Sequence, residues 1–341
     1  MRVFRMFMSW IDNVSPFLRL IAAGSIIFVL AVAAGQGQIV DKRLADATDR
    51  HVHILSPGLI KVWKGLGIPF SRPDEYYKDI DVILKNTAVK RIDLISMAHV
   101  FSSSDFGKFE NERALVEGEN SYVAAARDKH PKRTRAFCSV DPLRDYALEE
   151  LERCRVQLRM DGVKLHHNAN QVYLTEPEHL AKVRRVFEFA AQHKMPILMH
   201  FDNSHRRFGE PDITLLTGSI LNDLRPVRLT IAHFGTSGGF TARTRAFINT
   251  FIAELDTNKK LAKHQILFDI SAVALDKDSE GVRKLTDDEF VVLGRYVRRL
   301  GFERIAFATD YPLYTPGEYL EILRTRLDLK DKEIRALLRD K

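Results

Sequence analysis

Two histidines separated by one residue, His51 and His53, are the first feature of this sequence that could perform chemistry. Side chains alternate along a β-strand, so in a strand both imidazoles would face the same side. Two imidazoles at that spacing can bind one divalent ion. The pair alone is a weak signal, because twelve histidines in 341 residues produce such pairs by chance.

Three further polar residues each stand at the end of a short apolar run. They are His200, His233 and Asp310. Imidazoles together with one carboxylate are ligand types that suit Zn²⁺, and Mn²⁺, Co²⁺ and Ni²⁺ accept the same types. The residues therefore predict a divalent metal site, most simply a zinc site.

The elements that must position these residues are eight apolar, β-rich runs separated by longer amphipathic stretches. The runs are Ala47–Ile54, Arg91–Met97, Thr134–Val140, Gly162–Leu165, Pro196–Met199, Arg228–Ala232, Gln265–Ile270 and Arg304–Ala308. Stretches such as Glu178–His193 and Asp287–Leu300 have apolar residues at helical spacing. Eight such units in roughly 250–300 residues predict a single (β/α)₈ TIM-like barrel. A doubly wound sheet is the alternative, but no G-x-G-x-x-G turn follows an early strand.

In a barrel of this type the catalytic residues lie where strands end and βα loops begin. Five segments at such positions resemble the amidohydrolase superfamily, in particular its amidohydrolase-related branch of metal-dependent hydrolases. They are Asp49–His53, Gly162–His166, Pro196–His200, Ile231–Gly235 and Ala308–Pro312. The resemblance implies His51, His53, His200 and Asp310 as metal ligands. It implies His233 as a ligand of a second metal or as a catalytic residue over the substrate.

Lys164 and His166 share one face of the fourth run, and Lys164 faces the barrel interior. In several binuclear relatives a lysine here is carboxylated and bridges two metals, so the resemblance makes Lys164 and His166 possible bridging or substrate-binding residues. We favour an unmodified Lys164 that pairs with a barrel carboxylate or with an acid group of the substrate, because single-metal members of the branch lack the bridge.

The implied reaction is hydrolysis of an amide, ester, lactam or lactone. A bound ion would activate a water and polarise the carbonyl, Asp310 would transfer the proton, and His233 would stabilise the oxyanion. A non-oxidative decarboxylase of the same superfamily is the alternative. A phosphodiesterase or deoxyribonuclease ranks third, because those members usually have a glutamate at the Lys164 position. A non-catalytic binding module is expected to have lost one of the ligands.

Residues 1–40 differ in character from the remainder, which we take as one barrel domain over residues 41–341. Three arginines precede an uncharged run over residues 20–40, and small residues at 31–33 match a cleavage site. The segment predicts a signal peptide or an uncleaved membrane anchor. Because the positive flank stays inside, the barrel is expected to be exported, either periplasmic or tethered to the membrane outside the cytoplasm.

The composition is that of a globular protein, with 45% hydrophobic and 28% charged residues and a net charge of +7. Disorder and a polytopic membrane protein are excluded. We expect a small-molecule substrate and no nucleic acid, because the basic clusters are not interleaved with aromatic residues. We interpret the two cysteines as a buried, unbonded thiol pair. The possible substrate contacts His99, Asp202, Asn203, Arg206 and Arg207 are interpreted as surface polar residues.

Overall fold

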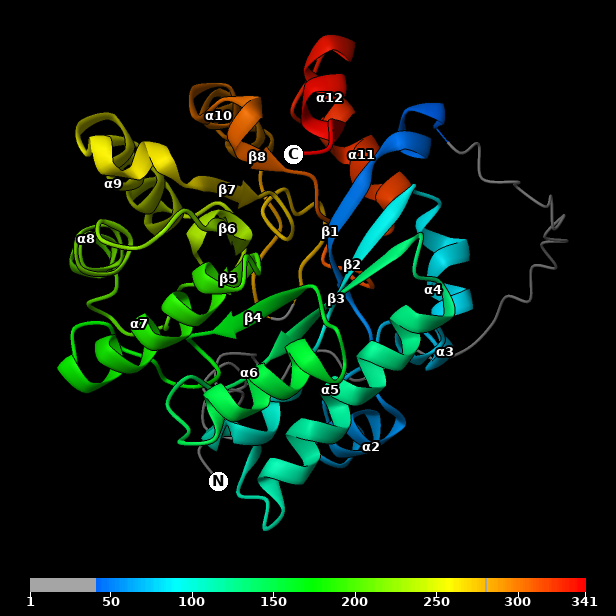
Figure 1. Ribbon diagram of the computed structural model, residues 1–341. Helices are drawn as coiled ribbons and strands as arrows, with labels where there is room; N and C mark the ends of the chain where they lie inside the picture. Colours follow the sequence, from blue (N-terminus) through cyan, green and yellow to red (C-terminus); the bar gives the residue numbers. More distant parts are fainter. Residues whose placement is uncertain (1–40, 280) are drawn as a thin grey trace, which may run out of the picture. The chain divides into compact units, whose positions relative to one another are not determined.

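Eight parallel strands form the centre of the protein in the computed structural model, which describes residues 41–279 and 281–341 (Figure 1). Each strand pairs with the next one along the chain. The strands are β1 (Thr48–His53), β2 (Arg91–Ile95), β3 (Thr134–Ser139), β4 (Gly162–His166), β5 (Ile197–His200), β6 (Arg228–Ile231), β7 (Gln265–Asp269) and β8 (Ile305–Ala306). This sequential order confirms the predicted barrel topology and excludes a doubly wound sheet, in which the strand order reverses.

The barrel closes between β1 and the segment that follows β8. His53 N donates to Tyr311 O (2.9 Å), Tyr311 N donates to His51 O (3.2 Å), and Arg50 N donates to Phe307 O (3.1 Å). β8 is shorter than the predicted run because its residues after Ala306 pair with β1 instead of continuing the ladder with β7. The other strands lie within a few residues of their predicted bounds.

Helices alternate with the strands and surround them (Figure 1). The helices are α2 (Pro57–Gly65), α3 (Glu75–Lys78), α4 (Ile80–Thr87), α5 (Glu112–Lys129), α6 (Ala147–Val156), α7 (Pro177–Gln192), α8 (Glu210–Thr214), α9 (Ala242–Thr257), α10 (Asp287–Leu300), α11 (Pro316–Thr325) and α12 (Asp331–Leu338). α7 and α10 confirm the two stretches predicted as helices. α10 begins with a capping box, in which Thr286 and Glu289 each accept a hydrogen bond from the other's backbone N–H.

Apolar side chains fill two layers, one between the strands and the helices and one inside the barrel. The outer layer consists of one large cluster, to which every strand contributes, and a smaller one under α2, α3 and α5. A third cluster, Ile95, Phe137, Leu198 and Ala232, lies inside. Gly162 is needed there, because a Cβ at that position would lie 2.5 Å from the Phe137 ring. The packed interior supports the polar residues at the strand ends.

The two cysteines form a disulfide between β3 and α6, so the prediction of an unbonded thiol pair was wrong. Cys138 and Cys154 are both fully buried, and their Cα atoms are 6.2 Å apart, within the range that a disulfide spans. The 16-residue separation along the chain does not reveal this proximity. The helix brings Cys154 back onto the strand that carries Cys138.

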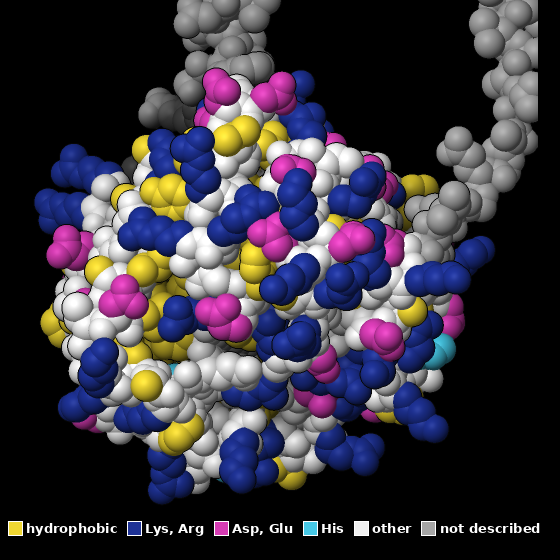
Figure 2. Space-filling view, turned by 90° about the horizontal axis from the view of Figure 1, so that it is seen from above, with side chains coloured by type: hydrophobic (Ala, Val, Ile, Leu, Met, Phe, Trp, Pro, Cys, Tyr) yellow, Lys and Arg dark blue, Asp and Glu magenta, His cyan; other side chains and the backbone are white. Residues whose placement is uncertain are grey.

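The proposed signal or anchor at residues 1–40 lies outside the described residues. Among the residues that are described, no helix combines the length and the apolar character needed to cross a membrane. On the face shown in Figure 2, Lys and Arg side chains are dispersed and interspersed with Asp and Glu. The positive net charge is therefore not gathered into one patch on this face.

Candidate metal centre

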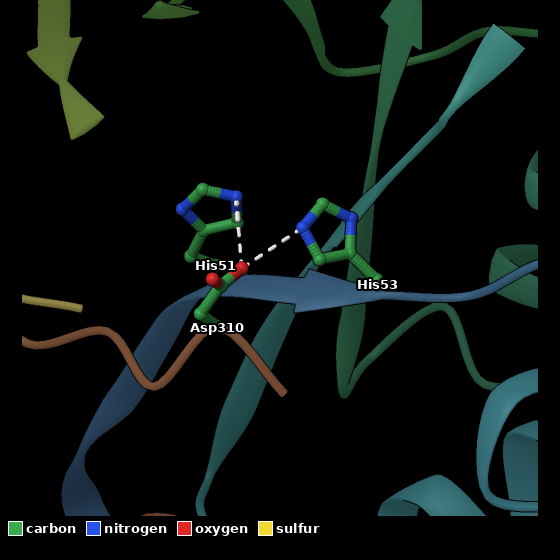
Figure 3. A group of neighbouring side chains, drawn as sticks. All are labelled: His51, His53 and Asp310. Carbon is green, nitrogen blue, oxygen red and sulfur yellow. Dashed lines mark hydrogen bonds and ion pairs between the residues drawn. The ribbon is translucent and has the colours of Figure 1, made fainter. Parts of the chain in front are cut away.

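His51 and His53 extend from β1 to the same side and meet Asp310, which follows β8 (Figure 3). The Nε2 atom of His53 is 3.0 Å from Oδ1 of Asp310, and the Nε2 atom of His51 is 3.6 Å from the same oxygen. The ligand atoms of the three residues lie within 4.8 Å of one another. The His51 side chain is fully buried, whereas those of His53 and Asp310 are 17% and 20% exposed. The group therefore combines a buried side with an open one.

Asp310 adopts a backbone conformation that non-glycine residues rarely use, with φ +55°. This backbone conformation costs about 1–3 kcal/mol and persists only where the surrounding structure stabilises it. Although burial acts to raise the pKa of Asp310, the imidazoles of His51 and His53 hold that pKa well below its usual range. The carboxylate is therefore ionised, as a metal ligand must be.

Asp269, at the end of β7, was missed as a site residue. Its Oδ2 atom lies 2.9 Å from Nδ1 of His51, and both side chains are fully buried. Nδ1 of His51 is thus the donor, and the lone pair of Nε2 faces Asp310. Burial and the Lys164 charge lower the pKa of His51 to about 4, so the ring is neutral. An acidic residue inside the otherwise apolar run Gln265–Ile270 was the available signal.

His233, after β6, is held in a defined orientation beside His51. Its Nδ1 atom donates to the carbonyl oxygen of Ser271 (2.9 Å), and the Ser271 hydroxyl donates to Asp269 Oδ1 (2.6 Å). The His233 and His51 rings stack with centroids 5.1 Å apart, and φ of His233 is +52°. Because Nδ1 donates to Ser271, Nε2 is the ring nitrogen that remains for a ligand or a substrate.

Lys164 is a buried amine beside the same group of ligands. Its Nζ atom is 3.5 Å from Nε2 of His51, and the residue is 1% exposed. Burial lowers the pKa of Lys164 to about 8, although the charges of Asp269 and Asp310 act to raise it. The amine thus lies inside the barrel next to His51, and the sequence predicted an inward-facing Lys164.

His200 and His166, at the ends of β5 and β4, stack on each other with ring centroids 4.0 Å apart. The Nε2 atom of His200 is 3.2 Å from the Ser237 hydroxyl, which itself donates to Asp202. Burial lowers the pKa of both imidazoles well below the usual value. Neither ring belongs to a ligand group within 4.8 Å among the described residues. His200 as a fourth ligand therefore stays a prediction.

Three of the five loop residues interpreted as surface polar groups are in fact buried. His99, Asp202 and Asn203 are 0%, 4% and 6% exposed, whereas Arg206 and Arg207 are exposed as expected. His99 is buried because its Nδ1 atom hydrogen-bonds to the Ser139 hydroxyl (2.7 Å) and its ring stacks on His166. The burial of His99, Asp202 and Asn203 at the strand ends is not evident from their loop positions in the sequence.

The donor set fits a divalent ion. Two imidazole Nε2 atoms and one ionised carboxylate converge, and Asp269 orients His51 as carboxylates orient metal-binding histidines elsewhere. A second group, His51, His233 and Asp269, also lies within 4.8 Å. It shares His51 with the first group, and its His51 nitrogen is already hydrogen-bonded to Asp269. This sharing favours one ion over two.

Comparisons with known proteins identify the family and the fold. A sequence model of the family described as amidohydrolase matches residues 49–340. No curated protein sequence matches the chain.

Several solved structures share the fold over nearly their whole length. The 5-carboxyvanillate decarboxylase LigW from Sphingomonas paucimobilis is 15% identical, with a TM-score of 0.56 over 86% of this chain and 96% of that one. The 2,6-dihydroxybenzoate decarboxylase from Rhizobium is 14% identical, with a TM-score of 0.56 over 86% of this chain and 96% of that one.

A 5-carboxyvanillate decarboxylase from Novosphingobium aromaticivorans was solved with manganese and 4-hydroxy-3-methoxy-5-nitrobenzoic acid. It is 14% identical, with a TM-score of 0.58 over 88% of this chain and 95% of that one. At these identities the likeness shows a shared fold. The family match covers most of the sequence and includes each residue of the ligand group described above. The chain therefore belongs to the amidohydrolase family.

Proposed function

We propose that this enzyme is a metal-dependent non-oxidative decarboxylase of a small carboxylic acid. The observation that carries the proposal is the buried Lys164 amine, 3.5 Å from a nitrogen of the metal ligand His51. The fold shared with decarboxylases supports it further. Hydrolysis, the reaction expected first from the sequence, is the competing outcome of the experiment below.

The residues that would hold the ion are His51, His53 and Asp310, with His200 as the candidate fourth ligand. A divalent ion held there supplies Lewis-acid polarisation of a substrate oxygen. Imidazole and carboxylate ligands accept both Zn²⁺ and Mn²⁺. The manganese in the structure from Novosphingobium aromaticivorans makes Mn²⁺ the first ion to test beside the Zn²⁺ expected from the sequence.

Lys164 would bind the carboxylate of the substrate. A buried ammonium group attracts an anion strongly, because little water screens the charge. The neighbouring imidazoles of His99, His166 and His200 are neutral, since burial lowers the pKa of each well below its usual value. They add no charge that would compete with Lys164 for the substrate.

The reaction breaks the bond between the substrate carbon and its carboxylate, and CO₂ leaves. The electron pair stays on the carbon, which then takes one proton. Asp310 borders the open side of the site and can transfer that proton from water. His233 presents the lone pair of Nε2 and can accept a proton from a substrate hydroxyl. Such a hydroxyl would feed electron density into the carbon that is protonated.

A cavity of about 350 Å³ lies on the far side of Ser237 from His200, and we propose that it holds the remainder of the substrate. Asp202 and Ser237 line it, and Ser237 contacts His200. Phe240, Val282 and Leu285 contribute apolar surface to the same cavity. Its volume lies in the range of small-ligand sites.

The test is a substrate panel with purified protein loaded with Mn²⁺ or Zn²⁺. The acids include 2,6-dihydroxybenzoate and 5-carboxyvanillate, and neutral esters and lactones form the other arm. We expect CO₂ release from at least one acid. Lys164→Met, which keeps the length of the side chain but removes its charge, should lower kcat/KM for that acid on the order of 10²-fold, because loss of one partner of a buried charge pair costs several kcal/mol. Ester or lactone opening without CO₂ release would contradict the proposal and favour hydrolysis.

We also propose that the barrel is exported, as residues 1–40 predict. The buried Cys138–Cys154 disulfide supports this, because disulfides persist mainly in oxidising compartments. Reporter fusions after residue 45 should be active outside the cytoplasm. Alkylation of denatured protein isolated from its native host should find no free thiols. Cytoplasmic reporter activity together with two free thiols would contradict export.

A further inference from the structure

His51 on β1 and Asp310, in the segment after β8, meet where the barrel closes. β8 contributes only Ile305–Ala306 to a regular ladder, and that ladder is with β7. On the other side, the pairing of β1 with β2 shifts register between Asp49 and Val52. Backbone hydrogen bonds cross the seam on either side of Asp310, from Arg50 N–H to Phe307 O and from Tyr311 N–H to His51 O. The backbone N–H groups of His51 and Thr309 instead donate to a side chain.

The carboxylate of Asp49 bridges this seam. Its Oδ2 atom accepts a hydrogen bond from the Thr309 hydroxyl (2.6 Å). Its Oδ1 atom accepts from the backbone N–H of Thr309 (3.1 Å) and from that of His51 (3.2 Å). Asp49 and Thr309 are both completely buried. Three donors from two distant parts of the chain thus converge on one carboxylate.

The partners of Asp49 are adjacent to the ligands themselves. Thr309 directly precedes Asp310, whose backbone is left-handed, and His51 is bonded through its own backbone N–H. Asp49 therefore links the backbone N–H of His51 to the backbone N–H of the residue that precedes Asp310. We propose that Asp49 and Thr309 are positioning residues of the metal centre, which set the separation of His51 from Asp310 without touching the ion or the substrate.

A purely structural role makes a different prediction. Any buried carboxylate with three donors stabilises the fold, so its loss lowers the free energy of unfolding. A positioning role additionally changes the affinity for the metal, because outer partners of metal ligands typically affect that affinity 10–100-fold. The distinguishing measurement is therefore Mn²⁺ binding, with thermal stability of the metal-free protein measured alongside.

The test compares Thr309→Val, which removes the hydroxyl at nearly constant volume, with Thr309→Ser, which keeps it. Mn²⁺ affinity is measured by calorimetric titration of the metal-free full chain. We expect Thr309→Val to weaken binding about 10–100-fold and Thr309→Ser to stay within about threefold of wild type. The matched control is Thr134→Val at the start of β3, a buried threonine whose hydroxyl donates to Arg127 O and His130 O. Its stability should fall while its Mn²⁺ affinity is unchanged.

With the two threonine variants, either of two results would overturn the proposal. One is wild-type Mn²⁺ affinity in a folded Thr309→Val variant. The other is an equal loss of affinity in Thr134→Val, which would assign the effect to general destabilisation. If Thr309→Val does not fold, Asp49→Asn provides the same measurement, because the amide keeps one acceptor oxygen and loses the other. Wild-type affinity in folded Asp49→Asn would likewise reject the positioning role.

Discussion

The two ends of the barrel both bury charged groups, but they use them differently. At the amino-terminal end, Asp93 accepts two hydrogen bonds from Arg135, each 2.7 Å long, and lies 3.7 Å from Arg50. Arg50 also donates to the carbonyl oxygen of Lys341 (2.6 Å). The cavity among these residues is only about 20 Å³, enough for about one water. The charges there are paired and the space is filled.

At the carboxyl-terminal end, several polar atoms are left without partners. Nδ1 of His53 and Nε2 of His99 are buried with no hydrogen bond, and a cavity of about 350 Å³ reaches Ser237, the partner of His200. His51 and Lys164 have strongly shifted pKa values, to about 4 and about 8. The comparison indicates that one end stabilises the barrel, while the other keeps donor atoms available for a ligand. Adjacent residues of one strand, Arg50 and His51, serve the two ends.

The largest expected effect belongs to the carboxyl-terminal end. His53→Ala removes one of three converging ligands, so we expect bound metal to fall close to zero and activity to fall at least about 10³-fold, because the ion supplies several kcal/mol of transition-state stabilisation. Metal content by elemental analysis and kcat/KM are the measurements. His130→Ala, an imidazole paired with Asp81 away from the site, is the control. Wild-type metal content in His53→Ala would refute the ligand assignment.

A substitution at the amino-terminal end should lower stability and leave metal binding unchanged. Arg135→Met leaves Asp93 buried with only the more distant Arg50, and loss of one partner from a buried ion pair costs about 3–5 kcal/mol. We expect the free energy of unfolding, measured in urea, to decrease by about 3 kcal/mol, the lower end of that range. The Mn²⁺ affinity should stay within twofold of wild type. A metal affinity that falls with stability would show that the two ends are not separate.

The sequence indicates the positions of these residues better than their interactions. His51, His53 and Asp310 could be predicted to converge because strand alternation and the barrel rule determine where side chains emerge. Asp269 could not, because its role depends on which nitrogen of His51 it contacts across the barrel. The ring orientation of His200 toward Ser237 and the approach of Cys154 to Cys138 likewise depend on packing between elements distant in the chain. Pattern rules describe single elements, whereas these contacts are made between them.

The smallest expected effect on stability concerns Glu119. It tests whether a buried atom without a hydrogen bond marks a ligand site. The Oε2 atom of Glu119 is buried without a hydrogen bond, as Nδ1 of His53 is, yet Glu119 does not belong to the ligand group of the metal centre. Oε1 accepts from the backbone N–H of Ser56 (3.0 Å) at the start of α2. Burial raises the pKa of Glu119 from 4.5 to about 7, although the hydrogen bond from Ser56 acts to lower it. If this atom marks only a buried acid, its removal should affect stability and leave the metal centre unchanged.

The predicted pH dependence follows from that raised pKa. Between about pH 4.5 and 7 the folded protein keeps a proton that the unfolded chain has released, so this contribution to stability is complete below pH 4.5 and lost as the pH rises through 7. Glu119→Gln keeps the acceptor for Ser56 but cannot ionise. We expect it to match wild type near pH 5 and to be more stable by on the order of 2 kcal/mol at pH 8, with unchanged Mn²⁺ affinity. Urea unfolding at both pH values measures this. Parallel stability curves would show that Glu119 ionises normally, and weakened Mn²⁺ binding would show that the metal centre extends to α5.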